Sequence, residues 1–200
     1  RFASDIVQVT VPSSSKVTNI GRSSRSEEIR LEGETNLAER TMQMQFWSGA
    51  GSVLQAQSGT SVKVENGKTF VRQSGGEWKE SDSLTDGVAP QGDFMGFLHA
   101  VRDVKANALE WNKGIAFTRY TFTLDGETFA LFVRNQMEEV MRSKGELPAG
   151  MNLSVSDYYR KMVGSGELWV AENGLPLRQI LTLQFPEQNN ETVNAQIKVD

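Results

Sequence analysis

Hydrophobic and polar residues alternate with a period of two along most of the chain. The clearest case is residues 28–32, where Ile29 and Leu31 alternate with glutamate and arginine. The same alternation recurs at residues 42–46, 62–65, 120–124 and 193–199, and Gly, Asn or Ser residues separate these runs. Successive side chains of a strand point to opposite faces, so the pattern is typical of an antiparallel sheet with one solvated face. We count about ten strands on this basis.

Turn sequences between the runs predict several β-hairpins. Asn66-Gly67 stands between two alternating runs, and Asn-Gly is the dipeptide that a two-residue hairpin turn favours. Gly75-Gly76 leads to Trp78, and Asn173-Gly174 follows the run at residues 168–170. Each pair predicts a chain reversal between neighbouring antiparallel strands.

Two longer segments have the helical period instead. Residues 93–104 place apolar side chains at i, i+3, i+4 and i+7, with Asp93 as the expected N-cap; these positions are Phe94, Phe97, Leu98 and Val101. Residues 127–143 repeat the spacing, and Gly145 and Pro148 follow as C-terminal signals. A third, short helix is expected over residues 155–163, capped by Ser154 or Ser156.

The order of these elements predicts an α+β fold in one domain spanning residues 1–200. A sheet of ten or eleven strands accumulates right-handed twist and curls. The expected architecture is therefore a strongly curved antiparallel half-barrel sheet that cradles two or three helices on its concave face.

The composition limits the kinds of binding site and catalytic site that the chain can form. Twenty-one basic and 25 acidic residues give a net charge of −4, so the chain has no excess of positive charge with which to bind nucleic acid. The absence of cysteine excludes disulfides and thiolate sites, and the single histidine, His99, is too few imidazoles for an ordinary zinc or iron site. We expect no metal, no cofactor and no catalytic residue, and we interpret His99 as a surface or boundary residue.

Two glycine-containing triplets, Gly49-Ala50-Gly51 and Gly164-Ser165-Gly166, resemble parts of phosphate-binding loops. Neither leads from a strand into a helix with the full spacing, so we interpret both as turns.

The ends of the sequence bear on its origin. It has no run of roughly 18 apolar residues, and residues 1–10 do not form a signal peptide. The abrupt opening at Arg1-Phe2 leads us to expect a domain trimmed from a longer precursor, with an anchor or signal preceding it.

The apolar stripes of the two predicted helices, together with apolar strand residues, form the candidate ligand-binding site. Its members are Met42, Met44, Phe46, Phe94, Phe97, Leu98, Val101, Tyr120, Phe122, Phe129, Phe132, Val133 and Met137. Two interpretations stay open: an ordinary core, or a cavity that holds an apolar ligand, since methionine adapts to varied apolar shapes.

Three strings carry a family resemblance. They are the hairpin at residues 66–78, the hairpin at residues 164–179, and the layout of helices between them. In these features the sequence resembles the LolA-like family of bacterial cell-envelope lipoprotein carriers, which includes lipoproteins of the LppX and LprG type. That family usually begins with a helix before its first strand, and this sequence lacks that helix and a lipobox cysteine.

The resemblance implies a non-enzymatic, extracytoplasmic protein, in the periplasm or on the outer face of the cell membrane, that carries or senses a lipid or an acyl chain. An envelope protein partner, and membrane association through a preceding segment, stay open, and we expect a monomer. The alternative is a protein-interaction or sensory domain with a closed core, and an enzyme ranks third.

Overall fold

A computed structural model describes residues 1–14, 19–36, 39, 41–48, 59–65, 68–73, 75–80, 95–143 and 145–200. The first six strands are β1 (Phe2–Pro12), β2 (Arg25–Asn36), β3 (Thr41–Ser48), β4 (Thr60–Glu65), β5 (Lys68–Gln73) and β6 (Lys79–Glu80). The last five are β7 (Val101–Asn112), β8 (Ile115–Leu124), β9 (Val163–Ala171), β10 (Pro176–Gln184) and β11 (Glu191–Val199). The helices are a short 3-10 helix η4 (Gly96–Ala100), α1 (Gly126–Ser143) and α2 (Asp157–Arg160).

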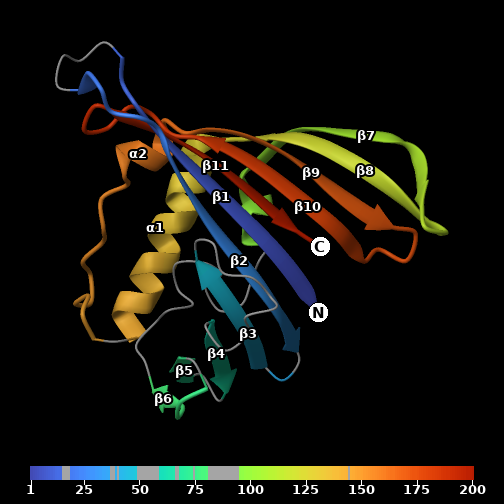
Figure 1. Cartoon of the computed structure of the whole chain (residues 1–200), viewed down its shortest axis with the longest axis horizontal. Helices are drawn as coiled ribbons and strands as arrows, with labels where there is room; N and C mark the ends of the chain where they lie inside the picture. The colour runs from blue at the N-terminus through green and yellow to red at the C-terminus, as the bar shows by residue number, and fades with distance from the viewer. Residues whose placement is uncertain are drawn as a thin grey trace.

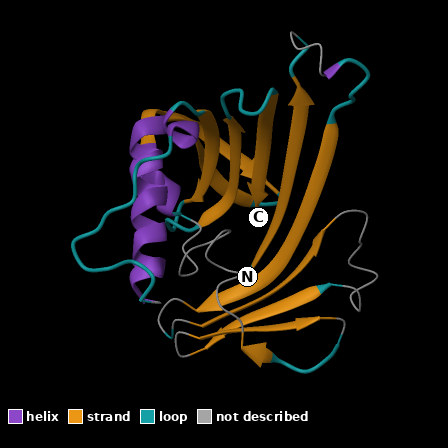
Figure 2. Cartoon of the chain, turned by 90° about the vertical axis from the view of Figure 1, so that its left-hand side faces the viewer, coloured by secondary structure: helices purple, strands orange, loops and turns teal. Residues whose placement is uncertain are grey.

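All eleven strands belong to one antiparallel sheet, in the order β6-β5-β4-β3-β2-β1-β11-β10-β9-β8-β7. The chain builds two meanders, β1 to β6 and β7 to β11, and the pairing of β1 with β11 joins them. The first and last strands therefore lie side by side in the middle of the sheet. Figures 1 and 2 show that the sheet is open, twisted and bent rather than flat. The predicted antiparallel sheet of ten or eleven strands is confirmed.

The predicted hairpins form as turn chemistry requires. Glu65 pairs with Lys68 at the end of the β4–β5 ladder, as the predicted hairpin requires, although Asn66 and Gly67 themselves lie outside the described residues. The Gly174 N–H donates to the carbonyl of Ala171 at 2.9 Å, and Gly174 has a φ of 82°. Local turn residues therefore set the register of these strand pairs.

Helix α1 confirms the predicted helix over residues 127–143. The Asp125 carboxylate accepts the N–H of Thr128 at 2.7 Å, which caps the first turn. Hydrogen bonds from the side chain and the backbone of Thr128 lower the pKa of Asp125 below its ordinary value. At the other end the Gly145 N–H donates to the carbonyl of Arg142, and Gly145 has a φ of 73°.

The helix predicted over residues 93–104 is wrong for half of its described part, residues 95–104. Only Gly96–Ala100 is helical, as a 3-10 turn, and β7 begins at Val101. Val101 pairs with Leu124, so residues that the periodicity assigned to a helix belong instead to strand β7. Glycine at position 96 weakens an α-helix by about 1 kcal/mol relative to alanine, which favours this outcome. Asp93 and Phe94 lie outside the described residues.

The third predicted helix, over residues 155–163, is shorter than expected. Helix α2 covers only Asp157–Arg160, and its N-cap residue Ser156 makes no side-chain capping bond. Val163 already belongs to β9, where it pairs with Gln184. The described part of the chain thus has one helix longer than five residues, rather than the two principal helices expected.

Candidate ligand-binding face of the sheet

The register of the sheet gathers apolar side chains on one face. Residues directly opposite each other in an antiparallel ladder point to the same side. Ile29 on β2 faces Ile6 on β1, Ile6 faces Ile197 on β11, and Ile197 faces Leu181 on β10. We call this side the apolar face, and the other side the polar face.

One half of the apolar face carries the N-terminal cluster, which we define as Leu31, Met42, Met44 and Val62. These four side chains are at most 5% exposed. Phe46 and Val71 are among the partly buried residues that pack against them. Three of the strand residues predicted for the site, Met42, Met44 and Phe46, therefore lie together here.

The other half carries the C-terminal cluster, which we define as Phe97, Ala100, Phe122, Leu124, Met162, Leu181 and Leu183. The rings of Phe97 and Phe122 stack with centroids 5.8 Å apart. Val101 and Phe129 pack against the cluster, so α1 contacts the sheet here through its first turns. Four of the predicted residues meet at this place.

The remaining described residues of the predicted site are half-buried or exposed. Tyr120 is half-buried on β8 opposite Leu168, and Phe132 and Val133 are half-buried on α1. Leu98 is 41% exposed and Met137 is 52% exposed, so the two helical stripes do not bury all their members.

Glycines on β9 let the C-terminal cluster close over the sheet. Gly164 and Gly166, interpreted above as turn residues, stand inside β9 on the apolar face, which corrects that prediction. A Cβ on Gly166 would lie 2.7 Å from the Ile180 carbonyl oxygen and 2.7 Å from the Phe122 ring. These positions are therefore packing sites. Gly49-Ala50-Gly51 lies outside the described residues.

Between the two clusters runs a strip of half-buried apolar side chains, which we call the central lane: Ile6, Ile29, Ala195 and Ile197. Ile6 and Ile29 pack against the N-terminal cluster, whereas Ala195 and Ile197 pack against the C-terminal cluster. The four side chains of the lane present only hydrocarbon, and Gln8, the register partner of Ala195, lies beside them on the same face. The lane can offer dispersion contacts and apolar burial to a ligand but no acid–base chemistry.

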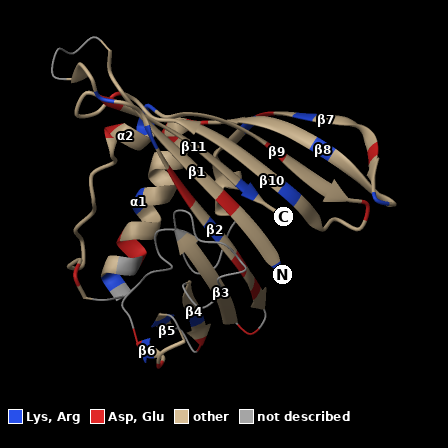
Figure 3. Ribbon diagram, viewed as in Figure 1, with Lys and Arg blue, Asp and Glu red and all other residues tan. Residues whose placement is uncertain are grey.

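The polar face has a different character. Figure 3 shows basic and acidic residues interspersed along the strands. Arg119 on β8 pairs with Glu110 on β7 at 3.0 Å, and on β9 the Trp169 indole N–H donates to Glu167 at 3.0 Å. The Arg178 guanidinium lies 4.7 Å from the centroid of the Trp169 ring.

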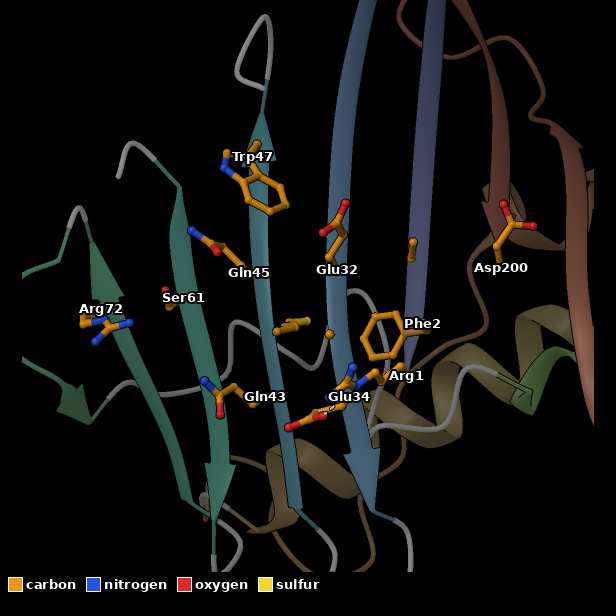
Figure 4. Close-up of a pocket in the computed structure, with 13 residues that line it drawn as sticks. Arg1, Phe2, Glu32, Glu34, Gln43, Gln45, Trp47, Ser61, Arg72 and Asp200 are labelled. Atoms are coloured by element: carbon orange, nitrogen blue, oxygen red, sulfur yellow. Dashed lines mark hydrogen bonds and ion pairs between the residues drawn. The ribbon is translucent and has the colours of Figure 1, made fainter. Parts of the chain in front are cut away.

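A hollow of about 630 Å³ lies on the polar face, over the strands from β5 to β1 and the end of β11 (Figure 4). Its lining is Arg1, Phe2, Ala3, Glu32, Gly33, Glu34, Gln43, Met44, Gln45, Trp47, Ser61, Arg72 and Asp200. Partial burial raises the pKa of Asp200, but hydrogen bonds from Arg178 and Lys198 outweigh it, so this pKa is below its ordinary value. In Figure 4 α1 passes behind the sheet, so the hollow and the helix lie on opposite sides.

The sequence contained one signal for this hollow that pattern reading passed over. In residues 42–47 the apolar positions are 42, 44 and 46, so Trp47 falls in phase with the polar residues Gln43 and Gln45. An aromatic side chain on the polar phase of a strand marks a place where that face is not simply solvated. Trp47 is only 5% exposed.

No set of three His, Asp or Glu side chains within the described ranges could hold a metal ion. His99 is exposed, with its ring 6.2 Å from that of Phe132. Among the helices that the structure describes, none has the length and apolar character needed to cross a membrane.

No protein-family model matches the chain, and no curated protein matches its sequence. The crystal structure of the lipoprotein LppX from Mycobacterium tuberculosis is 13% identical, with a TM-score of 0.38 over 97% of this chain and 84% of that chain. The crystal structure of LprF from Mycobacterium bovis has 12% sequence identity and a TM-score of 0.41, and the match covers 100% of this chain and 83% of that chain. The crystal structure of a DUF1329 family protein from Desulfovibrio piger has 8% sequence identity and a TM-score of 0.32, and the match covers 100% of this chain and 83% of that chain.

The first of these structures is a lipoprotein of the group that the sequence resembles, and LprF is related to it. At these identities and TM-scores the likeness carries neither a ligand nor an activity over to this chain.

Proposed function

We propose that this chain is a non-enzymatic, extracytoplasmic binding protein for a lipid or acyl-chain ligand, which lies along the central lane of the apolar face. The predicted residues of the two clusters would flank the ligand, and α1 and η4 would cover it from the helix side. The sequence resemblance to carriers of acyl chains fits this role and its extracytoplasmic location.

The central lane is the observation that carries the proposal. Its side chains are apolar yet only half-buried, although the clusters on both sides are nearly inaccessible. A bound acyl chain would remove this hydrocarbon surface from water. At about 0.8 kcal/mol per buried methylene, a sixteen-carbon chain gains on the order of 10 kcal/mol before the costs of binding are subtracted. Affinity therefore needs no specific polar contact.

Native mass spectrometry of protein purified from a lipid-containing host, followed by organic extraction, tests the proposal directly. We expect co-purified acyl lipid at near-unit occupancy. A clean unliganded mass, combined with no uptake of a fluorescent sixteen-carbon fatty acid, would refute it.

Two matched variants locate the ligand. Ile197→Ala removes three carbons from the central lane, and we expect it to weaken fatty-acid binding by about tenfold, which corresponds to about 1.4 kcal/mol. Val7→Ala shortens a half-buried side chain on the adjacent strand β1 that points to the polar face. It should leave the affinity unchanged, so equal effects of the two substitutions would place the ligand elsewhere.

A second candidate function, an interaction module, is favoured by the edge strand β7. Val104, Leu109 and Trp111 on this strand are 56%, 50% and 69% exposed. Figure 1 shows β7 at the border of the sheet, reaching away from α1. Exposed strand edges can pair with another chain. Concentration-dependent association in light scattering that Leu109→Lys abolishes, in a protein that takes up no fatty acid, would support this alternative.

A further inference from the structure

Two neighbouring hairpins of the C-terminal meander end together at the end of the sheet that lies away from α1 (Figure 1). They are the β7–β8 and β9–β10 hairpins, and Phe117, close to the first turn, is the register partner of Ala171, close to the second. Their ends expose three large apolar side chains, which we call the apolar tip: Trp111 is 69% exposed, Ile115 50% and Leu175 59%. Exposed apolar side chains are ordinarily scattered singly, so a group of them at one projecting end indicates a partner that covers it.

The apolar tip presents hydrocarbon to both sides of the sheet. Trp111 is the register partner of Ala116, which is on the same face of β8 as Phe122 of the C-terminal cluster. Ile115 is adjacent to Ala116 in β8, so its side chain points to the opposite face. A protein partner docks against one face, whereas a lipid layer surrounds whatever enters it. Apolar residues on both sides of one hairpin end therefore favour a lipid surface.

The size of the tip also argues against a protein partner, including a second copy of this chain. A stable protein interface buries about 800 Å² on each partner and uses about 20–30 residues a side. The two hairpin ends provide only the exposed residues 111–115 and 172–176. Pairing along the edge of β7 would not cover Leu175, which lies beyond β8 and β9. Entry into a lipid layer needs no minimum area, because each apolar side chain contributes separately.

Two charged side chains stand among the apolar ones. Lys113 is in the β7–β8 turn and Glu172 is in the β9–β10 turn, and both are exposed. Among the described residues neither takes part in an ion pair. Their charges cancel and the whole chain carries −4, so the tip has no long-range attraction to an anionic surface. A zwitterionic phospholipid headgroup, with one phosphate and one ammonium group, complements this pair of opposite charges.

The backbone of the β7–β8 turn makes Lys113 informative. Asn112 pairs with Ile115, so Lys113 and Gly114 form a two-residue turn, with φ values of 47° and 81°. Turns with two positive φ values favour asparagine and glycine, and lysine rarely adopts this conformation. Turn chemistry therefore does not favour lysine here, whereas a headgroup phosphate does. Its long stem can keep the ammonium group at headgroup level while neighbouring apolar side chains lie deeper.

From these observations we propose that the apolar tip docks on a zwitterionic phospholipid surface. Trp111, Ile115 and Leu175 would enter the boundary between headgroups and acyl chains, where tryptophan is favoured. Lys113 would contact headgroup phosphates, and Glu172 would face the ammonium groups. The contact involves the two turns alone, so it is separate from the proposed acyl site and does not depend on it.

Co-sedimentation with vesicles of pure palmitoyl-oleoyl-phosphatidylcholine tests the docking. The full chain should bind, and about 0.5 M NaCl should change the affinity less than about twofold, because apolar contacts are not screened. Trp111→Ser and Leu175→Ser should each weaken binding about tenfold, which corresponds to about 1.4 kcal/mol. Val163→Ser is the matched control, because Val163 is 66% exposed but lies at the other end of β9. It should bind as the wild type does.

Tryptophan fluorescence measures whether the tip enters the lipid. Vesicles of the same lipid with brominated acyl chains quench an indole that reaches those chains. Trp111→Phe should keep most of the binding but lose most of the quenching. The other indoles are less accessible: Trp47 is buried, and the Trp169 ring packs between Phe117 and Arg178. Quenching that persists in Trp111→Phe would contradict entry through this tip.

Three further results would overturn the proposal. They are no sedimentation with these vesicles, equal binding by the wild type and both serine variants of the tip, and binding that requires anionic phosphatidylglycerol and disappears in salt. The Ile197→Ala variant of the central lane should sediment as the wild type does, which separates docking from uptake into the acyl site. Melting midpoints of the tip variants should be unchanged, because the substituted side chains are exposed, and so exclude loss of the fold.

Discussion

Phe97→Ala tests how the segment before β7 is built. Phe97 is 6% exposed and stacks on Phe122, whereas the adjacent Leu98 is 41% exposed. A buried aromatic side chain removes about 150–250 Å² from water, which at about 25 cal/mol per Å² is worth roughly 4–6 kcal/mol. Measured substitutions of buried phenylalanine by alanine cost about 3–5 kcal/mol, and we expect a loss in that range.

The matched control is Leu98→Ala in the same turn. Because its side chain is largely solvated, we expect a loss of about 0.5–1 kcal/mol. Each kcal/mol shifts the melting midpoint of a domain of this size by about 2–4 °C, so Phe97→Ala should lower it by about 6–20 °C. Urea and thermal unfolding followed by circular dichroism measure both losses. Equal losses would refute the 3-10 turn, because the helix expected from the periodicity buries both residues on one stripe.

Two further substitutions have matched expectations. Gly166→Ala places a Cβ 2.7 Å from a backbone oxygen and from Phe122, so it should cost about 1–3 kcal/mol, whereas the exposed neighbour Ser165→Ala should stay within about 0.5 kcal/mol; equal urea midpoints would contradict this packing. Asp125→Ala should cost about 0.5–2 kcal/mol by removing the α1 cap. Because folding lowers the pKa of Asp125, its contribution is complete above the unfolded pKa of about 3.9 and is lost as the pH falls through the lower folded value. A difference between wild type and variant that grows on acidification, measured by urea unfolding at several pH values, would contradict the assignment.

The strands and hairpins could be predicted because their determinants are local. Ile29 and Leu31 alternate with charged residues, and the structure places them on the apolar face. Asn173-Gly174 supplies the positive φ that its turn requires, and the turn forms where expected. In both cases a few consecutive residues contain the whole signal.

The predictions failed where residues distant in the sequence determine the local structure. The apolar spacing at Phe97, Leu98 and Val101 is helical, but pairing of Val101 with Leu124 on β8 draws the chain into the sheet. Gly166 looks like a turn residue in the sequence, but in the structure Phe122 and Leu181 pack against it. At these positions tertiary packing overrides the local conformational preference. The packing partners are distant in the sequence, so local patterns do not reveal them.

The sequence predicted which way the strand residues of the candidate site point, but not how the candidate residues are arranged in space. Alternation correctly put Met42 and Met44 on the inward face of their strand. The predicted residues nevertheless fall into two clusters, because the central lane between them consists of β1 and β11, which lie at opposite ends of the sequence. No local pattern relates Ile6 to Ile197. The hollow around Trp47 was missed for the same reason, since its lining comes from strands β1 to β5 and from Asp200 after β11.

The β1–β11 pairing also permits a direct test of the sheet, because the chain contains no cysteine and one engineered disulfide would be unambiguous. Val7 and Gln196 are register partners whose side chains point to the polar face, away from the central lane. Opposed positions in an antiparallel pair lie within the Cα separation that a disulfide spans. Val7→Cys combined with Gln196→Cys should therefore oxidise readily and link the two meanders.

Such a link closes most of the chain into one loop, so it should stabilise by about 2–4 kcal/mol. The melting midpoint should then rise by about 4–16 °C in oxidised protein and return on reduction, with fatty-acid binding unchanged. A pair that stays reduced would contradict the central pairing of the sheet. A pair that forms but blocks fatty-acid uptake reversibly would show that β1 and β11 must separate to admit the ligand, and would contradict a lane that is already open on the surface of the paired strands.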